Sequence, residues 1–476
     1  MHRRTIRKTK MQIYFVDALA GAGKTTAAIK HALAQVEIGA KVAIVQPSTQ
    51  LIDQTYNALV KSARPKTQIT KYHTQCADSV KTTVSNHLRA AAPGVGEILL
   101  ISHQTFLTLP YWHNAKDWDV IIDELPQIED DWTANLPVNH AAFTSHVEVR
   151  RDSNKYCQIT TKAGSETEVQ RMAECLLNDQ QDKIYQTVCQ KLHNPQAWTT
   201  YVNVESWDKV VSGEEMGKHQ ITTFSLLKPQ SFNKYRTVTI MGAMFKDSVL
   251  YLLWQREVEF IEHAAIASNL SMRFHTNGEL LTIKYLFDGT WSKTLKETKI
   301  GSVTVANRAR EVIEELMGEE MFLYAANTTD APMDLGIRVA NVCHGLNKYK
   351  HIHNVVFFSA LNASPQNYAF MGEVGVSPEL LRRARGYQTL YQTIMRTSLR
   401  NPADTNSKTV VVMDKESAEY LSLFFPGCAV EQIENAPEIV KPKRGRKKTG
   451  NAKSNAERTR KCRELKKAQQ QQNGAN

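Results

Sequence analysis

The chain has 476 residues, of which 42% are hydrophobic and 22% are charged. At about 100 to 200 residues per domain, this length allows roughly three globular domains with buried cores. No run approaches about 18 consecutive apolar residues, which excludes a transmembrane helix.

Charge is unevenly placed along the chain. The net charge is +11, yet residues 441–476 alone carry 13 Lys or Arg against two Glu, and residues 1–10 carry five bases and no acid. Residues 11–440 therefore have a net charge of −5. We expect a polyanionic partner to be attracted chiefly through the ends of the chain. The seven cysteines are scattered without paired spacing, which favours a reduced, cytoplasmic protein (host cytoplasm if viral).

The first half of the chain repeats apolar, β-rich runs that are followed by turns and helical stretches. These runs are IYFV, VAIV, ILLI and DVIID, the last at residues 119–123. Strands that are apolar on both faces suit a parallel sheet covered by helices, so we predict an α/β domain over residues 11–265. Residues 132–225 lose the pattern and become polar, and we predict a mainly helical insertion there.

A second set of strand-like runs predicts another α/β domain over residues 266–437. The runs are LLTIKYLF, EEMFLYAAN, HNVVFFSAL and KTVVVMD. Residues 438–476 are rich in basic residues and end in a glutamine run, so we predict a largely disordered tail. The basic residues 1–10 are predicted to form an N-terminal extension.

A candidate phosphate-binding loop lies between the first predicted strand and a helix. Its glycines allow backbone N–H groups to face phosphate oxygens at the positive end of the following helix. Lys24 would reach the outer phosphates and Thr25 would hold Mg²⁺. The full motif has glycine where this chain has Ala18. The candidate nucleotide-binding residues here are Ala20, Gly21, Ala22, Gly23, Lys24, Thr25 and Thr26.

An acidic pair follows the strand run DVII. Asp123 and Glu124 would lie at the carboxyl edge of a parallel sheet, which is also the edge of the phosphate loop. Asp123 would complete the Mg²⁺ site, and Glu124 would orient or deprotonate the attacking water. A surface acid pair without function is the alternative.

These two motifs resemble those of superfamily-2 (DEAD/DEAH-like) helicases. The segment VQPSTQ resembles their motif Ia, which implies that Pro47, Ser48 and Thr49 contact nucleic acid, and LLISHQTF implies the same for His103. The segment IMGAMF stands where the family has Ser-Ala-Thr, but its hydroxyl groups are missing. The resemblance implies two RecA-like P-loop NTPase domains.

The second half of the chain resembles the later helicase motifs. Gly345 and Asn347 resemble motif V, which implies that they face both the nucleotide and the nucleic acid, although a turn before a strand needs Gly and Asn in any case. Gln392, Arg396 and Arg400 resemble motif VI, with the second arginine one residue late. Arg396 and Arg400 would share one face of a helix and complete the ATP site, and a solvated helix face is the alternative.

The resemblance implies an ATP hydrolase, with ATP and Mg²⁺ as cofactors, that moves along or unwinds nucleic acid. We expect DNA rather than RNA as the partner and no membrane, while replication or recombination partners stay open. The compact motor and its basic tail also resemble predicted bacteriophage helicases. Tail residues that would contact the phosphate backbone are Lys443, Arg444, Arg446, Lys447 and Lys448.

Three alternatives stay open from the sequence. A packaging ATPase or a kinase would share the phosphate loop, and a nucleic-acid-binding adaptor could carry a relic ATP site. The tail could serve solubility alone.

Overall fold

The computed structural model describes residues 10–75, 79–136, 140–175, 179–212, 219–341 and 348–437. Residues 1–9 of the predicted N-terminal extension lie outside these ranges, and so does the predicted disordered tail with Lys443, Arg444, Arg446, Lys447 and Lys448. Gly345 and Asn347 also lie outside them. None of the described helices is long and apolar enough to cross a membrane.

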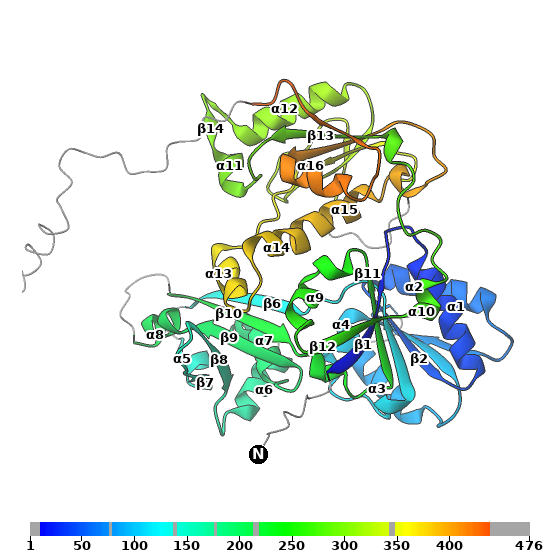
Figure 1. The fold of residues 1–476 in the computed structure, drawn as a ribbon. Helices are drawn as coiled ribbons and strands as arrows, with labels where there is room; N and C mark the ends of the chain where they lie inside the picture. Colours follow the sequence, from blue (N-terminus) through cyan, green and yellow to red (C-terminus); the bar gives the residue numbers. More distant parts are fainter. Residues whose placement is uncertain are drawn as a thin grey trace, which may run out of the picture. The chain divides into compact units, whose positions relative to one another are not determined.

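A seven-stranded parallel sheet forms what we call the first lobe (Figure 1). Its strand order is β12-β1-β11-β5-β2-β4-β3. The strands are β1 Met11–Asp17, β2 Lys41–Gln46, β3 Gln68–Lys71, β4 Glu97–Ser102, β5 Trp118–Ile122, β11 Thr237–Gly242 and β12 Val258–Glu262. Asp17 pairs with Gly242 and Ile240 with Ile122, so the chain leaves β1, β11 and β5 at one edge.

Both faces of this sheet are covered, which explains its apolar strands. Val42 and Ile44 contribute to one core, with α1 and α2, while Ala43 and Val45 contribute to the other, with α3, α4 and α9. Successive side chains of a strand point to opposite faces, so burial of both faces requires an unbroken apolar run. The helices are α1 Lys24–Glu37, α2 Thr49–Ser62, α3 Val80–Ala90, α4 His103–Thr108, α9 Val249–Trp254 and α10 Ala264–Ala267.

The insertion between β5 and β11 is a mixed α/β unit, which corrects the prediction of a mainly helical one. Its five-stranded antiparallel sheet has the order β6-β10-β9-β8-β7. The strands are β6 Glu129–Leu136, β7 Val147–Arg150, β8 Tyr156–Thr161, β9 Trp198–Asn203 and β10 His219–Leu227; the helices are α5 Ala141–Thr144, α6 Glu166–Glu174, α7 Gln180–Leu192 and α8 Val204–Ser212. In β9, buried and less buried residues alternate, so this strand lacks the apolar run of a strand in the parallel sheets.

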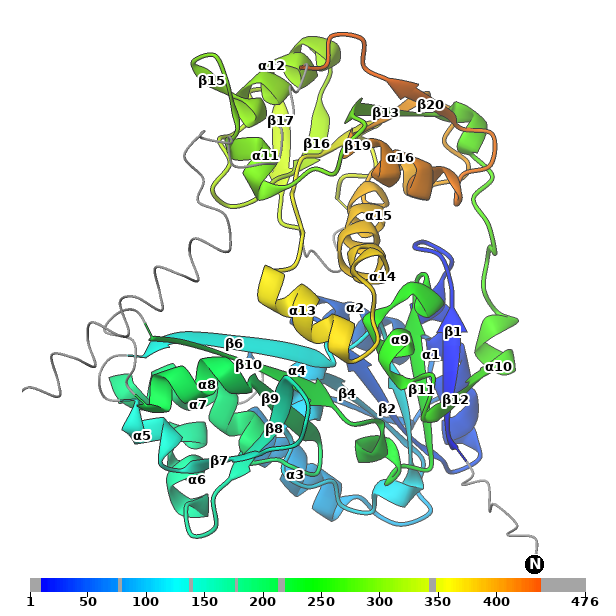
Figure 2. The ribbon, with the colours of Figure 1, turned by 60° about the vertical axis from the view of Figure 1, so that its left-hand side comes forward.

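The second lobe is built on a six-stranded parallel sheet of order β17-β16-β18-β19-β13-β20 (Figure 2). Its strands are β13 Leu281–Phe287, β16 Phe322–Ala325, β17 Gly336–Val339, β18 Asn354–Phe357, β19 Lys408–Asp414 and β20 Ala429–Gln432, beside the small β14 Lys299–Ile300 and β15 Val303–Thr304. Helices α11 Lys293–Glu297, α12 Val305–Met317 and α16 Lys415–Ser422 belong to this lobe. Two parallel sheets flanked by helices confirm the predicted α/β class.

A run of helices within residues 365–394, which we call the arm, passes from the insertion to the second lobe (Figures 1 and 2). It comprises α13 Pro365–Glu373, α14 Pro378–Arg382, a π-helical turn Arg383–Tyr387 and α15 Gln388–Ile394. Phe370 of α13 stacks on Phe224 of β10 at 4.4 Å between ring centroids. The arm thus connects the insertion to the segment that carries the predicted motif VI.

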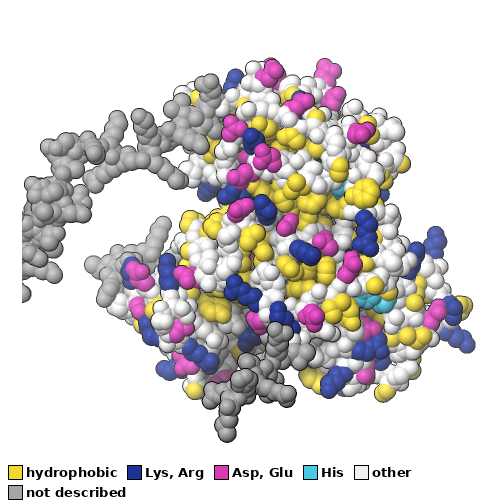
Figure 3. All heavy atoms as spheres, in the orientation of Figure 1, with side chains coloured by type: hydrophobic (Ala, Val, Ile, Leu, Met, Phe, Trp, Pro, Cys, Tyr) yellow, Lys and Arg dark blue, Asp and Glu magenta, His cyan; other side chains and the backbone are white. Residues whose placement is uncertain are grey.

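The face drawn in Figure 3 intersperses Lys and Arg with Asp and Glu. Apolar side chains gather in the middle of this face. On this face, the described residues show no broad field of one charge sign that would mark a polyanion site.

Candidate active site

The phosphate loop joins β1 to α1, as predicted. Gly21 and Gly23 have φ angles of +88° and +79°, a region that glycine enters without a steric penalty. Gly23 precedes α1, and no side chain caps the helix there. The first backbone N–H groups of α1 are therefore available to an anion, and the helix dipole favours negative charge at this end.

Arg400 of the second lobe lies directly on this loop. A β-carbon built at Gly21 would be 3.0 Å from Cγ of Arg400, so Gly21 combines a left-handed backbone with a lack of room. Burial lowers the pKa of the Arg400 guanidinium, and the charges of Glu124 and Tyr391 act in the opposite direction. The loop and Glu124 of one lobe thus face an arginine of the other.

Asp123 is held at the carboxyl end of β5 by several neighbours. Thr25 Oγ1 donates a hydrogen bond of 2.8 Å to Asp123 Oδ2, and Gln46 Nε2 donates one of 3.1 Å to the same oxygen. The Asp123 carboxyl is 1% exposed, and burial followed by the charge of Glu124 raises its pKa. A cation beside it would offset both effects.

The arrangement of Thr25 and Asp123 fits Mg²⁺. Asp123 Oδ1 is buried and has no hydrogen-bond partner among the residues that the structure describes, so one carboxylate oxygen is available to a metal. Within the described ranges, no cluster of three or more His, Cys, Asp or Glu could hold a metal ion. One carboxylate beside a hydroxyl suits Mg²⁺, which is commonly bound through one or two carboxylates together with substrate phosphates.

Lys24 and Glu124 face each other beside the loop. Lys24 Nζ is 3.6 Å from Glu124 Oε1 and donates a hydrogen bond of 3.3 Å to the carbonyl oxygen of Ala18. Glu124 has a φ angle of +69°, which is uncommon for a residue with a side chain and costs about 1–3 kcal/mol. The chain therefore turns abruptly after Asp123, and the Glu124 carboxylate faces the same cavity as Lys24.

The prediction that Arg396 and Arg400 share one helix face is wrong. Helix α15 ends at Ile394, and Arg400 belongs to the short 3-10 turn Ser398–Arg400. The side chains of Thr397 and Asn401 form hydrogen bonds that compete with a helix: Thr397 Oγ1 donates to the Ile394 carbonyl oxygen, and Asn401 Oδ1 accepts from the Ala403 N–H. Both arginines nevertheless line the same cavity.

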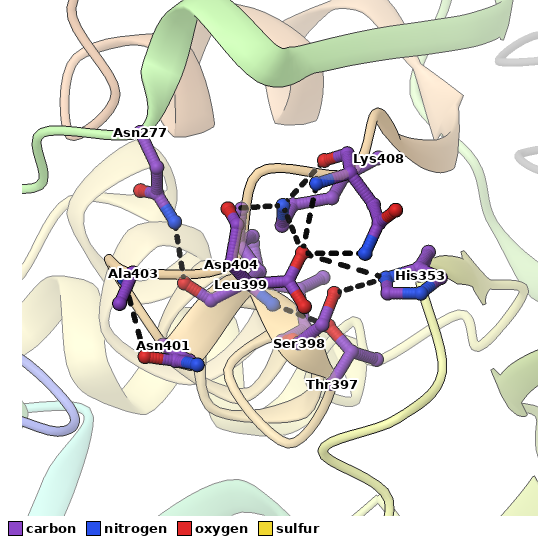
Figure 4. A network of polar contacts seen from close by, with 11 residues as sticks. Asn277, His353, Thr397, Ser398, Leu399, Asn401, Ala403, Asp404 and Lys408 are labelled. Atoms are coloured by element: carbon purple, nitrogen blue, oxygen red, sulfur yellow. Dashed lines mark hydrogen bonds and ion pairs between the residues drawn. The ribbon is translucent and has the colours of Figure 1, made fainter.

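A polar network holds the turn that carries Arg400 (Figure 4). His353 Nδ1 pairs with Ser398 Oγ at 2.8 Å, and Asn277 Nδ2 donates a hydrogen bond of 3.0 Å to the Leu399 carbonyl oxygen. Lys408, whose side chain is fully buried, donates a bond of 2.9 Å to Asp404 beyond the turn. The guanidinium of Arg400 therefore extends from a backbone that is fixed on both sides.

One cavity of about 580 Å³ brings most of the predicted residues together. This volume lies in the usual range of ligand pockets. Of the predicted nucleotide-binding residues of the loop, all but the core residue Ala22 line it. The lining residues are Ala20, Gly21, Gly23, Lys24, Thr25, Thr26, Leu51, Gln54, Glu124, Lys350, Gln392, Met395, Arg396, Arg400 and Asn401. We name it the nucleotide cavity.

Tyr391 and Gln388 contact the first lobe beside the cavity, and neither residue was predicted from the sequence. The Ala20 N–H donates a hydrogen bond of 3.1 Å to the Tyr391 hydroxyl oxygen. Gln388 Nε2 donates one of 3.1 Å to the carbonyl oxygen of Met244. The segment that lacks the Ser-Ala-Thr hydroxyls is thus linked to the second lobe through its backbone. Both residues lie close in sequence to Gln392 of the predicted motif VI, and this proximity could have identified them.

The predicted nucleic-acid residues of the first lobe lie outside the nucleotide cavity. Ser48 caps α2 by accepting a hydrogen bond of 3.3 Å from the Leu51 N–H. Pro47 and Thr49 flank it at the carboxyl end of β2. His103 Nε2 pairs with the Asp123 carbonyl oxygen at 3.0 Å. His103 is therefore linked to the metal-site segment, and its contact with nucleic acid stays a prediction.

Comparison with known proteins gives a family match for the first lobe. Residues 2–143 match the family model of the DEAD/DEAH box helicases. No curated protein matches the chain. One similar solved structure is a variant of S. cerevisiae Dbp5 bound to RNA and ADP BeF3, with 11% identity, a TM-score of 0.38 and coverage of 90% of this chain and 86% of that chain. Mss116p bound to ssRNA and AMP-PNP has 9% identity, a TM-score of 0.34 and coverage of 90% of this chain and 72% of that chain. RecG bound to a three-way DNA junction has 10% identity, a TM-score of 0.35 and coverage of 88% of this chain and 42% of that chain.

At these identities and TM-scores, the solved structures do not identify the function of this chain. The matched segment contains the phosphate loop, the Asp123-Glu124 pair and the strands that carry them. Residues 2–143 are therefore similar to the DEAD/DEAH box helicases.

Proposed function

We propose that the protein is an ATP-dependent nucleic-acid helicase or translocase, with RecA-like domains at residues 11–265 and 266–437. One observation carries the proposal. Lys24, Thr25 and Glu124 of the first lobe and Arg396 and Arg400 of the second lobe line the same cavity. A nucleotide bound there would contact both lobes, so loss of its γ-phosphate would change the contact between them.

The residues of this cavity suit in-line hydrolysis of ATP. The loop N–H groups and Lys24 would bind the phosphates, and a Mg²⁺ ion held by Thr25 and Asp123 would neutralise their charge. Glu124 would accept a proton from the attacking water, whose oxygen bonds to the γ-phosphorus as the bond to the β–γ bridging oxygen breaks. Arg396 and Arg400 would stabilise the charge on the transferred group, a contribution of about 10³ to 10⁵ in rate for an arginine of this kind.

Contacts between the lobes support coupling of hydrolysis to movement. The hydroxyl of Tyr420 in α16 donates a hydrogen bond of 3.0 Å to Asp247, three residues after Met244. Together with Gln388, it links the β11 edge to the second lobe. A change at the γ-phosphate can therefore reach the second lobe through the arginines and through the β11 segment.

The net charge of the insertion supports a nucleic-acid site outside it. Residues 129–227 contain 14 Asp or Glu and nine Lys or Arg, a net charge of −5. We propose that nucleic acid contacts Pro47, Ser48, Thr49 and His103, and that the basic residues after Val440 anchor its backbone. Removal of residues 441–476 should flatten the salt dependence of binding, and an unchanged salt dependence would contradict the anchoring role.

ATP hydrolysis with and without single-stranded DNA and RNA tests the proposal. We expect stimulation by nucleic acid, and we propose DNA rather than RNA as the partner. Lys24→Ala should lower the rate by about 10²-fold or more, since it removes a cation from the phosphates. Lys30→Ala, an exposed residue of the same helix, should match the unaltered protein.

The outcomes separate the proposal from its alternatives. Normal hydrolysis in Lys24→Ala would contradict the assignment of the cavity. Hydrolysis that neither polymer stimulates would favour a kinase or another P-loop ATPase, and binding of nucleic acid without hydrolysis would favour an adaptor with a relic site. Duplex unwinding then distinguishes a helicase from a translocase.

A further inference from the structure

A second cavity, of about 360 Å³, adjoins the nucleotide cavity and shares three residues with it. The shared residues are Glu124, Gln392 and Arg396. Its other walls come from the chain after Glu124, from the first turns after β11 and from the arm. Glu124 therefore lies on the boundary between the nucleotide cavity, which contains the phosphate loop, and the second cavity.

The chemistry at Glu124 indicates which reaction product would enter the second cavity. In an in-line displacement, the attacking water and the leaving ADP lie on opposite sides of the transferred group. After the bond to ADP breaks, inorganic phosphate lies between ADP and Glu124, and ADP still fills the way back along the loop. Resting on the proposed ATP hydrolysis, we infer that the phosphate leaves through the second cavity, which is a transient oxyanion site.

The lining of the second cavity suits such an anion. Gln127 and Gln388 line it, so amide donors are present along its walls. Thr389 also lines it, and its hydroxyl donates a hydrogen bond of 2.7 Å to the Arg385 carbonyl oxygen. Arg396 is 7% exposed and belongs to both cavities, so an anion that passes from one to the other stays near the same guanidinium. Charge-assisted hydrogen bonds to a guanidinium are about twice as strong as neutral ones.

An ion pair joins the insertion to the arm in the wall of this cavity. Arg385 Nη2 of the arm is 2.7 Å from Glu129 Oε2 at the start of β6, and Arg385 Nε donates a hydrogen bond of 2.9 Å to Glu129 Oε1. Both side chains line the second cavity. The bidentate pair neutralises a carboxylate that would repel phosphate, and it ties the insertion to the arm beside the route. The Arg385–Glu129 ion pair thus controls the opening of the phosphate exit route.

Two variants change the route in opposite directions. Glu129→Gln removes the acidic charge and the ion pair with little change of size, so phosphate release should become about three- to tenfold faster. Ala384→Leu places a larger side chain in the cavity wall, so release should become several-fold slower. Arg383→Ala, which removes an exposed pair with Glu379 on the same π-helical turn, is the matched control.

The experiment follows one turnover of ATP with single-stranded DNA bound. Quenched flow measures cleavage, and a fluorescent phosphate sensor measures release. The inference expects cleavage at the unaltered rate in all variants, with release changed only in Glu129→Gln and Ala384→Leu. Circular dichroism verifies their folding.

If Glu129→Gln and Ala384→Leu both cleave ATP normally and release phosphate at the unaltered rate, the exit route is wrong, while the proposed function is not contradicted. Changed cleavage with unchanged release would also overturn the exit route. Absence of cleavage in the unaltered protein would overturn the proposed function itself and the exit route with it.

Discussion

Gly242 ends β11 against the acidic segment, and its lack of a side chain matters there. A β-carbon at this position would lie 2.6 Å from Cγ of Leu125, the neighbour of the strained Glu124. Gly242→Ala should therefore displace Leu125 and with it the Glu124 carboxylate. We expect ATP hydrolysis to fall by about tenfold or more, because small misplacements of a catalytic group cost that much.

The matched control for Gly242 is Gly372→Ala in α13. A β-carbon at Gly372 meets nothing within 4 Å, so this change should leave hydrolysis unaltered. Steady-state ATPase assays at saturating ATP and Mg²⁺ measure both variants. Equal rates for Gly242→Ala and the unaltered protein would show that Leu125 adapts without moving Glu124.

At the residue scale, the sequence predicted those groups of the site whose roles follow from local pattern. Lys24, Thr25, Asp123 and Glu124 each follow a strand at a typical spacing, and the structure brings them together. Tyr391 could not be predicted in the same way, because its partner Ala20 is 371 residues away along the chain. Such a contact depends on how the lobes pack, which no local pattern records.

At the element scale, the strands of both parallel sheets were predictable because burial on two faces leaves an apolar run. The insertion sheet was not, since β9 alternates Trp198, Thr200 and Val202 with less buried residues and β6 begins with three acids. The end of α15 was also missed. The Thr393 and Thr397 hydroxyls donate hydrogen bonds to carbonyl oxygens of the preceding turn, and such side-chain bonds compete with the backbone bonds that would continue the helix.

The contact between the insertion and the arm is a testable element-scale feature. Phe370 is 1% exposed, stacks on Phe224 and contacts Tyr156 at 5.4 Å between centroids. Phe370→Ala should lower the free energy of unfolding by about 3–5 kcal/mol, the usual cost of removing a buried Phe. Urea denaturation of Phe370→Ala, Phe224→Ala and the double variant should show a coupling energy of about 0.5–3 kcal/mol.

A pair from separate clusters serves as the control for that cycle. Phe425 belongs to another core cluster, so its loss should add to that of Phe370. Additive costs for Phe370 and Phe224 would contradict a direct connection between α13 and the insertion sheet.

At the scale of the whole molecule, His275 lies in the segment between the two parallel sheets and contacts both lobes through Tyr391. Its ring stacks on Phe425 at 4.4 Å, and its Nε2 pairs with the Tyr391 hydroxyl at 2.8 Å. That hydroxyl accepts a hydrogen bond from the Ala20 N–H, which leaves its own proton available for a neutral imidazole nitrogen. Burial lowers the pKa of His275 to about 4.

Acid should therefore weaken the folded molecule through His275. An unfolded histidine has a pKa of about 6.5, so between about pH 6.5 and 4 the unfolded chain binds more protons than the folded one, and the free energy of unfolding falls as pH falls. His275→Gln keeps an acceptor for Tyr391 but cannot titrate. From pH 7 to 4.5 it should lose about 2 kcal/mol less than the unaltered protein in urea denaturation. His351→Gln, an exposed residue, should follow the unaltered protein. Parallel pH profiles for all three proteins would show that His275 is not buried as a neutral acceptor.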